Sequence, residues 1–245
     1  MKLTVKVAMA AGLALALVGS AQANNLFGID VSSYQGSITW SSVYANGARY
    51  AFAKATEGNY YRDAYFNSNM TNGKAAGMQM GAYDFCRPDQ HCPSVEVNYF
   101  WSFAGGKIIA DGKSIFPMVD FETFNGHPCE STYTAWMNDW SVDVKAKTSH
   151  FMHPVLYSSA GTGMCDMTTA CTLSAWVANY NGLNLYTGYP WTCCTSCNYV
   201  SPGSTCCWTY WQVTSSGRIG GISGNCDFDA YPATLAQLIS WQGIK

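Results

Sequence analysis

Short apolar runs are separated by longer amphipathic stretches along most of the chain. Eight of these runs have the β-branched and aromatic composition of strands. Because they alternate with segments of helical character, the pattern predicts an α/β sheet rather than an all-β sandwich. Eight strands are enough to close a barrel. The predicted strands are residues 26–31, 50–55, 79–85, 115–121, 155–158, 175–178, 210–214 and 226–228.

Amphipathic stretches with N-cap residue types at their starts predict four helices. The segment 181–209 interrupts the alternation, because it is rich in Gly, Pro, Cys, Tyr and Thr and lacks periodicity, and we expect a long disulfide-stapled insertion there. No linker divides the chain, so a single domain over residues 24–245 is expected. The predicted helices run from Asp63 toward Gly77, from Ser94 through Phe103, from Ser131 or Thr132 to Lys147, and over residues 233–239.

Residues 1–23 have the composition of a secretory signal peptide. Lys2 and Lys6 precede an apolar run over residues 7–18, and Ala21-Gln22-Ala23 fits the small-residue cleavage rule. A membrane anchor is the alternative, but it needs about 18 apolar residues, and this run is shorter. We therefore expect cleavage before Asn24, and a secreted or periplasmic protein that does not associate with a membrane afterwards.

Composition narrows the class of protein. The chain is 48% hydrophobic, 15% aromatic and only 11% charged, which argues against disorder and against a coiled coil. Removing Lys2 and Lys6 from the 13 basic residues leaves 11 against 15 acidic residues, a net charge of −4. No basic stripe indicates a nucleic-acid partner, and we expect a monomer.

Eleven cysteines together with an export signal indicate disulfides in an oxidising compartment. The odd number leaves at least one thiol free or intermolecular. Cys86 with Cys92, and Cys165 with Cys171, are the pairs that short loops favour.

Metal and cofactor sites have weaker support. The five cysteines between positions 193 and 207 could bind zinc, but export favours disulfides. His150-x-x-His153 has no acidic third ligand nearby. The chain also lacks a Gly-x-Ser-x-Gly elbow, a phosphate-binding loop and a dinucleotide motif. We expect no metal and no cofactor.

Carboxylates fall where predicted strands end. Asp30 closes the first strand, Asp120 and Glu122 close the fourth, and Asp227 lies in the last. In a parallel α/β barrel the carboxyl ends of the strands meet on one face, where active sites are built. Four acids there repel one another unless their protonation states differ, and such a difference is what general acid catalysis requires.

The spacing of Asp120 and Glu122 favours a shared role. Residues two apart on a strand point to the same side, with Cα atoms about 6.5–7 Å apart, so Phe121 faces away. One carboxylate raises the pKa of the other, so one member can keep a proton and donate it to a leaving group. Two solvated surface acids are the alternative, but the apolar run over residues 115–119 places this pair at the mouth of a buried strand.

Aromatic residues supply a second indication of function. Their flat apolar faces and polar edges suit sugar rings, although core packing explains any one of them equally well. Those at or near predicted strand ends are Tyr83, Tyr157, Trp176, Tyr180 and Trp211.

Read together, these residues resemble glycoside hydrolase family 25, the Chalaropsis-type lysozymes or N,O-diacetylmuramidases. The resemblance runs in order over nearly the whole chain after the signal peptide. The matching segments are Gly28-Ile29-Asp30-Val31-Ser32 with Gln35-Gly36, Phe52-Ala53-Lys54-Ala55-Thr56-Glu57-Gly58, Gly81-Ala82-Tyr83, Pro117-Met118-Val119-Asp120-Phe121-Glu122, Pro154-Val155-Leu156-Tyr157-Ser158, Trp176-Val177-Ala178, Trp211-Gln212 and Asp227.

The resemblance implies a flattened, incomplete β/α (TIM-like) barrel that hydrolyses the β-1,4 bond between N-acetylmuramic acid and N-acetylglucosamine in peptidoglycan. Glu122 would be the proton donor, and Asp120 would hold the substrate acetamido group or stabilise an oxazolinium-like intermediate. Asp30 and Asp227 would tune the charge and bind sugar. An inverting reaction with a positioned water is the alternative mechanism.

Three residues in or next to the matched segments carry further expectations. The family usually has His after the Gly-x-Tyr segment, where this chain has Asp84, and we expect this extra acid to bind sugar or to shift the pKa of Glu122. Lys54 and Glu57 are either functional residues or a structural ion pair.

Other functions remain compatible with the same residues. The fold could serve as a glycan-binding module without catalysis, or as a chitinase-like hydrolase. Retention of four mutually repelling acids favours the enzyme, because a binding module does not need them.

Overall fold

The computed structural model describes residues 24–147, 154–160, 163–166, 173–191 and 208–244. The predicted signal peptide lies outside the described residues. So do His150 and His153, Cys171, and the five cysteines between positions 193 and 207.

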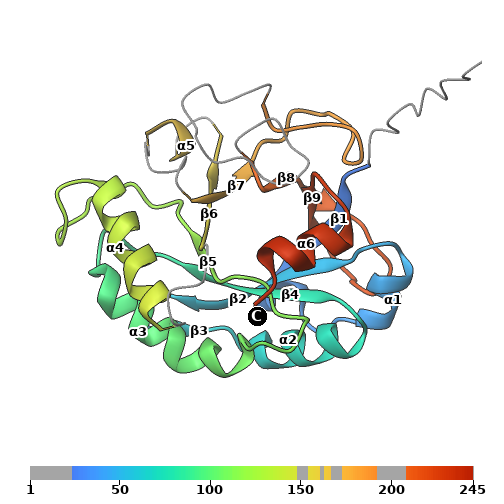
Figure 1. The fold of residues 1–245 in the computed structure, drawn as a ribbon, viewed down its shortest axis with the longest axis horizontal. Helices are drawn as coiled ribbons and strands as arrows, with labels where there is room; N and C mark the ends of the chain where they lie inside the picture. Colours follow the sequence, from blue (N-terminus) through green and yellow to red (C-terminus); the bar gives the residue numbers. More distant parts are fainter. Residues whose placement is uncertain (1–23, 148–153, 161–162, 167–172, 192–207, 245) are drawn as a thin grey trace, which may run out of the picture.

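Eight strands close into a barrel (Figure 1). The sheet order is β1-β9-β8-β7-β6-β5-β4-β2-β3, and a further pairing of β1 with β2 joins its ends, leaving β3 outside the ring. All pairings from β1 through β2 and β4 to β8 are parallel, whereas β9 is antiparallel to both β8 and β1. The strands are β1 (Leu26–Val31), β2 (Tyr50–Glu57), β3 (Tyr61–Arg62), β4 (Gln79–Phe85), β5 (Met118–Asp120), β6 (Val155–Ser159), β7 (Ser174–Ala178), β8 (Tyr210–Gly217) and β9 (Cys226–Tyr231).

The eight predicted strands are confirmed, although β2, β8 and β9 extend past their predicted ends and two larger differences remain. The predicted strand over residues 115–121 is reduced to the three residues of β5. Pro117 has no N–H for a strand ladder, and Ile115 instead forms an isolated bridge to Gly243 near the C-terminus. The two-residue β3 is too short for a hydrophobic pattern to reveal.

Helices lie on the outside of the barrel and across one of its ends. Thr132 and Thr234 cap α4 and α6 through their hydroxyl groups, as their residue types suggest. The sequence missed α1, whose N-cap Thr39 makes no side-chain capping bond. The helices are α1 (Trp40–Ala45), α2 (Phe66–Ala75), α3 (Pro93–Ala104), α4 (Tyr133–Ala146), α5 (Gly163–Asp166) and α6 (Leu235–Gln242), with two short 3₁₀ turns, η1 (Ser33–Gln35) and η2 (Gly105–Lys107).

Asp63 does not cap α2 as predicted, because the N-cap of α2 is Tyr65. Asp63 is instead buried, and its carboxylate accepts hydrogen bonds from the backbone N–H groups of Ser33 at 2.7 Å and Tyr65 at 2.9 Å.

The helical layer is incomplete, as predicted. Helices α1 to α4 cover the side of the barrel formed by β1 to β5 (Figure 1). Between β6 and β8 the described residues include only the four-residue α5. A first apolar core fills the space between the sheet and the helices, and a second, rich in tyrosine, fills the barrel interior.

One end of the barrel is closed by α6. Leu238 is fully buried in the interior core, and the Gln242 side chain donates to the Ser174 hydroxyl at the start of β7. Because α6 blocks the end where the parallel strands begin, only the opposite mouth remains for a site.

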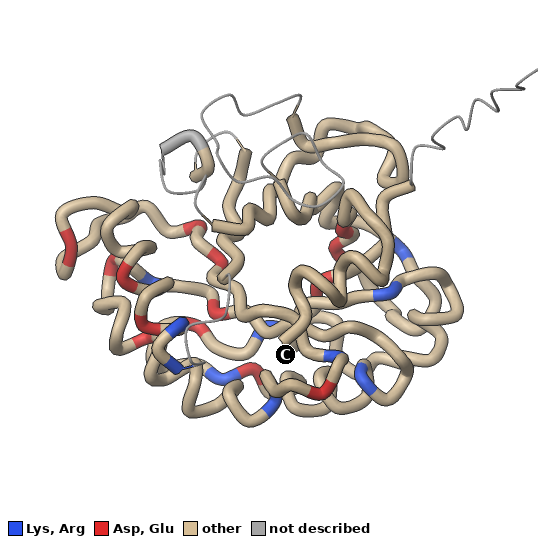
Figure 2. Tube along the Cα trace, in the orientation of Figure 1, with Lys and Arg blue, Asp and Glu red and all other residues tan. Residues whose placement is uncertain are grey.

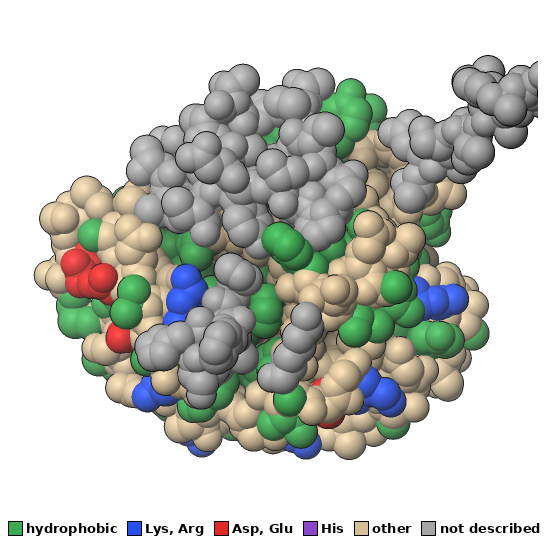
Figure 3. All heavy atoms as spheres, in the orientation of Figure 1, with side chains coloured by type: hydrophobic (Ala, Val, Ile, Leu, Met, Phe, Trp, Pro, Cys, Tyr) green, Lys and Arg blue, Asp and Glu red, His purple; other side chains and the backbone are tan. Residues whose placement is uncertain are grey.

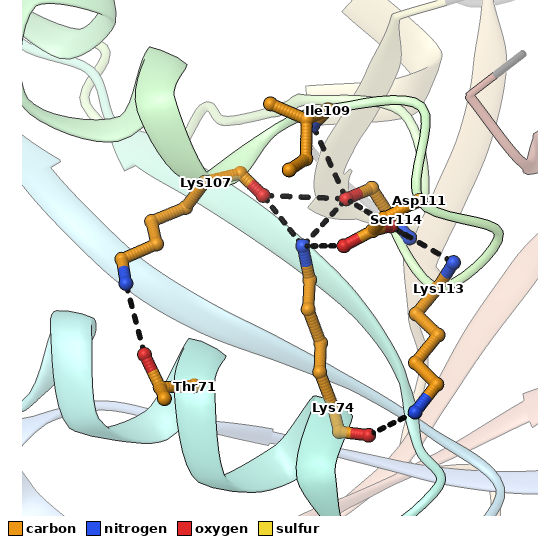
Figure 4. A network of polar contacts seen from close by, with 7 residues as sticks. All are labelled: Thr71, Lys74, Lys107, Ile109, Asp111, Lys113 and Ser114. Carbon is orange, nitrogen blue, oxygen red and sulfur yellow. Dashed lines mark hydrogen bonds and ion pairs between the residues drawn. The ribbon is translucent and has the colours of Figure 1, made fainter.

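Lysine side chains fix the connection between α3 and β5 (Figure 4). Lys74 of α2 donates to the Lys107 carbonyl and the Ser114 hydroxyl at 2.7 Å each, and to the Asp111 carboxylate at 2.8 Å. Since these donors are all used within the fold, we assign this cluster a structural role.

The predicted disulfide between Cys86 and Cys92 is wrong. Cys92 bonds to Cys129, 37 residues away, and this bridge ties the start of α3 to the segment that follows β5. Cys86 carries a free thiol, because its side chain points into the core between the sheet and the helices. Cys226 is a second buried free thiol. The predicted pair Cys165 and Cys171 includes a residue outside the described ones.

Candidate active site

A cleft of about 290 Å³ opens at the mouth where the parallel strands end. Acidic positions lie on opposite walls of the barrel (Figure 2). Because β9 runs antiparallel, its beginning lies at the same mouth, which brings Asp227 beside Asp30 in register. Eight of the ten predicted site residues line the cleft, together with Phe85 and Gln212. Those eight are Asp30, Tyr83, Asp120, Glu122, Tyr157, Trp176, Tyr180 and Asp227.

The two remaining predicted residues, Asp84 and Trp211, do not line the cleft. Asp84 follows Tyr83 on β4 and points to the opposite face, where it is 0% exposed and accepts a 2.6 Å hydrogen bond from the Thr56 hydroxyl. Trp211 is also fully buried, and its indole N–H donates to the Asn179 carbonyl. The prediction that these two side chains contact sugar is therefore wrong, because alternation along each strand turns them outward.

Asp120 and Glu122 share the cleft but differ in burial. Asp120 ends β5 and is 8% exposed, whereas Glu122 lies just beyond the strand and is exposed. Phe121 faces away and packs against Phe124 and Trp136, as the alternation predicts. Burial, and then the neighbouring Glu122 carboxylate, raise the pKa of Asp120 well above its ordinary value. The pair therefore favours keeping one proton.

A second acidic group occupies the opposite wall. Asp30 is nearly buried, and it accepts a 2.8 Å hydrogen bond from the side-chain amide of Gln212. Burial first, then the charges of Asp229 and Asp227, raise the pKa of Asp30 well above its usual range. Burial also raises the pKa of Asp227. The mouth therefore combines several carboxyl groups that favour the neutral form.

Gln212 links the acidic and aromatic walls. Its side-chain oxygen accepts hydrogen bonds from the hydroxyl groups of Tyr157 at 2.8 Å and Tyr180 at 2.6 Å, while its amide donates to Asp30. The sequence singled out the neighbouring Trp211 instead. Side chains alternate along β8, so Trp211 packs outside the barrel and Gln212 points into the cleft. This alternation is the signal that distinguishes Gln212 from Trp211.

Asp229 supports the floor of the cleft and was not predicted. It is fully buried inside the barrel and accepts a 2.8 Å hydrogen bond from the indole N–H of Trp176. Trp176 in turn packs against Tyr157, with ring centroids 4.5 Å apart. Asp229 lies two residues after Asp227 on β9, so it points to the same side, but it falls just beyond the predicted strand end.

Lys54 and Glu57 form the ion pair that the sequence left open, with 2.9 Å between Nζ and Oε2. Arg87 approaches the same carboxylate at 3.5 Å, and the Lys54 ammonium lies 4.7 Å from the centre of the Phe85 ring. The positive charge of Lys54 opposes the rise in the pKa of Asp120. The pair is therefore structural in geometry and adjoins the cleft electrostatically.

The described parts of the chain give little support for other kinds of site. No group of three His, Cys, Asp or Glu side chains is arranged there to hold a metal ion. No described helix has the length and hydropathy needed to cross a membrane. On the face shown in Figure 3, lysine and arginine side chains are scattered rather than joined in a stripe.

A barrel with paired carboxylates and aromatic walls at one mouth has the architecture of a glycoside hydrolase. The family model described as Glycosyl hydrolases family 25 matches residues 29–222. The chain belongs to this family.

Individual relatives agree with this assignment. Lysozyme M1 of Streptomyces globisporus is 33% identical over 235 residues, covering 91% of this chain and 73% of that protein. An N,O-diacetylmuramidase of Arthroderma benhamiae is 29% identical over 233 residues, covering 89% and 90%. The crystal structure of a bacterial lysozyme from Streptomyces coelicolor is 32% identical, covers 89% of this chain and 97% of that chain, and has a TM-score of 0.73. The predicted family, the barrel fold and the class, a glycoside hydrolase of the lysozyme type, are confirmed.

Proposed function

We propose that the enzyme is an exported muramidase that cleaves the β-1,4 bond between N-acetylmuramic acid and N-acetylglucosamine in peptidoglycan. The observation that carries this proposal is the pairing of buried Asp120 with exposed Glu122 in an aromatic-walled cleft. Glycoside hydrolysis needs one group that protonates the leaving oxygen and another that stabilises the positive charge developing on the sugar.

Glu122 is the general acid in this mechanism. Its exposure at the cleft mouth leaves it free to reach a glycosidic oxygen, whereas Asp120 lies deeper. Burial by itself favours the proton on Asp120. A bound acetamido N–H would favour the charged form of Asp120 by hydrogen bonding, so the proton of the pair would move to Glu122 as substrate binds.

The bond then breaks with assistance from the substrate. The acetamido oxygen attacks the anomeric carbon, the bond to the leaving oxygen breaks, and that oxygen takes the proton of Glu122. Asp120 stabilises the oxazolinium-like intermediate by accepting a hydrogen bond from the N–H of the sugar's former acetamido group. Water, deprotonated by the Glu122 carboxylate, opens the intermediate and restores the acid. Direct attack by a positioned water is the alternative, and it would give the opposite anomer.

The remaining cleft residues bind and orient the sugar. Asp30 and Asp227 hold sugar polar groups and set the charge of the mouth, and Gln212 fixes Asp30. The rings of Tyr83, Tyr157, Trp176 and Tyr180 form the walls against which sugar faces pack. Neither a cofactor nor a metal has a step in this mechanism, and we propose that the enzyme acts as a secreted or periplasmic monomer.

Product analysis tests the proposal. Purified peptidoglycan and chitin are digested separately with the protein, and mass spectrometry identifies the new reducing ends. The proposal predicts muropeptides ending in N-acetylmuramic acid. Products ending in N-acetylglucosamine, or a preference for chitin, would favour a chitinase-like enzyme. Binding without any product would favour a glycan-binding module. The anomer of the fresh product, read by NMR, separates the two mechanisms.

A further inference from the structure

A second, smaller pocket of about 170 Å³ adjoins the cleft on the side of Asp30 and Asp227. The two cavities share Asp30, Asp227 and Tyr83, so they adjoin each other at the mouth of the barrel. The carboxylate pair at Asp120 and Glu122 borders only the larger cavity, and no role in bond cleavage falls on the smaller one.

An exposed aromatic ring forms one wall of this pocket. Tyr34, in the turn η1, is 78% exposed, more than any other large hydrophobic side chain among the described residues. Polar side chains from both rims complete the lining, with Ser32 on the side of Tyr34 and Ser215 and Asn225 from the β8–β9 hairpin opposite. A flat ring beside hydroxyl and amide groups matches the mixed apolar and polar faces of a sugar.

The turn that presents Tyr34 is held from several directions. The Ser32 hydroxyl accepts from the Tyr34 N–H, and the Ser32 N–H donates to the Gln35 side chain, which completes a capping box. The Gln35 amide reaches across to the Asn225 carbonyl at 3.2 Å.

The buried carboxylate of Asp63 adds a further anchor by accepting the Ser33 N–H at 2.7 Å. An exposed ring on so constrained a turn is preorganised, which reduces the entropy lost when a ligand packs on it.

We propose that this pocket is a second sugar-binding subsite, in which the Tyr34 ring stacks on an N-acetylhexosamine unit of the glycan away from the bond that is cleaved. Ser32, Ser215 and Asn225 provide hydrogen bonds to its hydroxyl and acetamido groups. The inference rests on the proposed function, because it extends the same glycan beyond the carboxylate pair.

Chain-length dependence tests the subsite. The substrates are peptide-free, alternating glycan oligomers of increasing length, and the proteins are wild type, Tyr34→Ala, Tyr34→Phe and Tyr189→Ala. Tyr189 is a matched control, because it is 44% exposed and lies outside both cavities. Tyr34→Ala should lose about tenfold in kcat/KM on the longest oligomers, mostly through KM, with a smaller loss on shorter ones. Tyr34→Phe should retain the wild-type profile, since the ring is kept, and Tyr189→Ala should match wild type.

Binding to the Glu122→Gln protein, measured by calorimetry with the longest oligomer, separates this inference from the proposed function. Tyr34→Ala should weaken binding about tenfold in that background. Binding that depends on Tyr34 without hydrolysis by wild type would refute the proposed function and support the subsite. Hydrolysis and binding that are both insensitive to Tyr34→Ala at every length would overturn the subsite alone.

Discussion

Asp84 and Glu96 form a buried acidic pair behind the sheet, and this pair predicts a fold that is more stable in acid than at alkaline pH. Burial raises the pKa of Asp84 to about 7, opposed by the Thr56 hydrogen bond and the charge of Lys54. Burial first, and then the charge of Asp84, raise the pKa of Glu96 to about 9. Both Glu96 oxygens accept the Arg87 backbone N–H, at 3.0 and 3.2 Å.

The size of this pH-dependent change in folding stability follows from the Asp84 carboxyl alone. In the unfolded chain its pKa returns to the ordinary value of 3.8, against about 7 in the fold. The folded state therefore holds the proton more tightly, so the stability it contributes is fully present below pH 3.8 and is lost as the pH rises through 7. At about 1.4 kcal/mol per pKa unit, the loss between pH 4 and pH 8 is about 4 kcal/mol.

The substitution Asp84→Asn removes the titrating proton with little change in shape. Urea unfolding from pH 4 to pH 8 gives the free energy of unfolding of variant and wild type. The difference in free energy of unfolding between the variant and wild type should shift by about 4 kcal/mol in favour of the variant between pH 4 and pH 8. This shift does not depend on the size of the difference at pH 4.

A matched control has the opposite sign. The hydrogen bond from Arg87 lowers the pKa of Asp89, so its charge stabilises the fold above its ordinary pKa and that stability is lost in acid. Asp89→Asn should therefore lose stability at pH 8 relative to pH 3. A difference between Asp84→Asn and wild type that stays constant from pH 4 to pH 8 would show that the Asp84 carboxyl does not keep its proton more tightly in the fold than in the unfolded chain.

Three further predictions concern the framework of the cleft. Replacing Cys92 and Cys129 by Ala should lower the free energy of unfolding by about 4 kcal/mol in urea, because their bridge closes a loop with a sequence separation of 37; an unchanged midpoint would contradict this. Asp229→Asn should keep near wild-type kcat/KM and stability, since its side-chain oxygen still accepts the Trp176 N–H. Asp229→Leu removes this acceptor and should lower the free energy of unfolding by about 1–3 kcal/mol. Equal free energies of unfolding for the two variants would contradict the positioning role of Asp229. Gln212→Leu should lower kcat/KM on peptidoglycan by roughly tenfold or more, because three side-chain hydrogen bonds disappear together, and wild-type kinetics would contradict its linking role.

Strand positions were largely predictable from the sequence, because buried parallel strands are nearly continuous apolar runs. The exception was the run over residues 115–121, where the strand begins only after Pro117 although the hydrophobic pattern continues across it. The four acids at the mouth could also be placed, since each lies at or next to the end of a strand and the carboxyl ends of parallel strands converge.

The direction of individual side chains was harder to predict than the positions of the strands. Asp84 and Trp211 have the residue types of a sugar site, but their neighbours Tyr83 and Gln212 occupy the inward positions. A strand has two faces, and chemical type alone does not fix which face turns toward the barrel interior. The disulfide was unpredictable for a related reason: Cys129 approaches Cys92 only after α3 and the segment following β5 pack together.

In the proposed mechanism, Glu122 donates the proton while Asp120 assists the acetamido group. A direct test of these two roles compares Glu122→Gln and Asp120→Asn on a natural glycan and on an aryl glycoside of the same sugars, whose 2,4-dinitrophenyl leaving group departs without protonation. Glu122→Gln should lose about 10²–10⁴-fold in kcat on the glycan but little in bond cleavage on the aryl glycoside. Asp120→Asn should lose activity on both. Two results would contradict these roles. One is an equal loss of bond cleavage by Glu122→Gln on the glycan and on the aryl glycoside. The other is a loss by Asp120→Asn on the glycan alone.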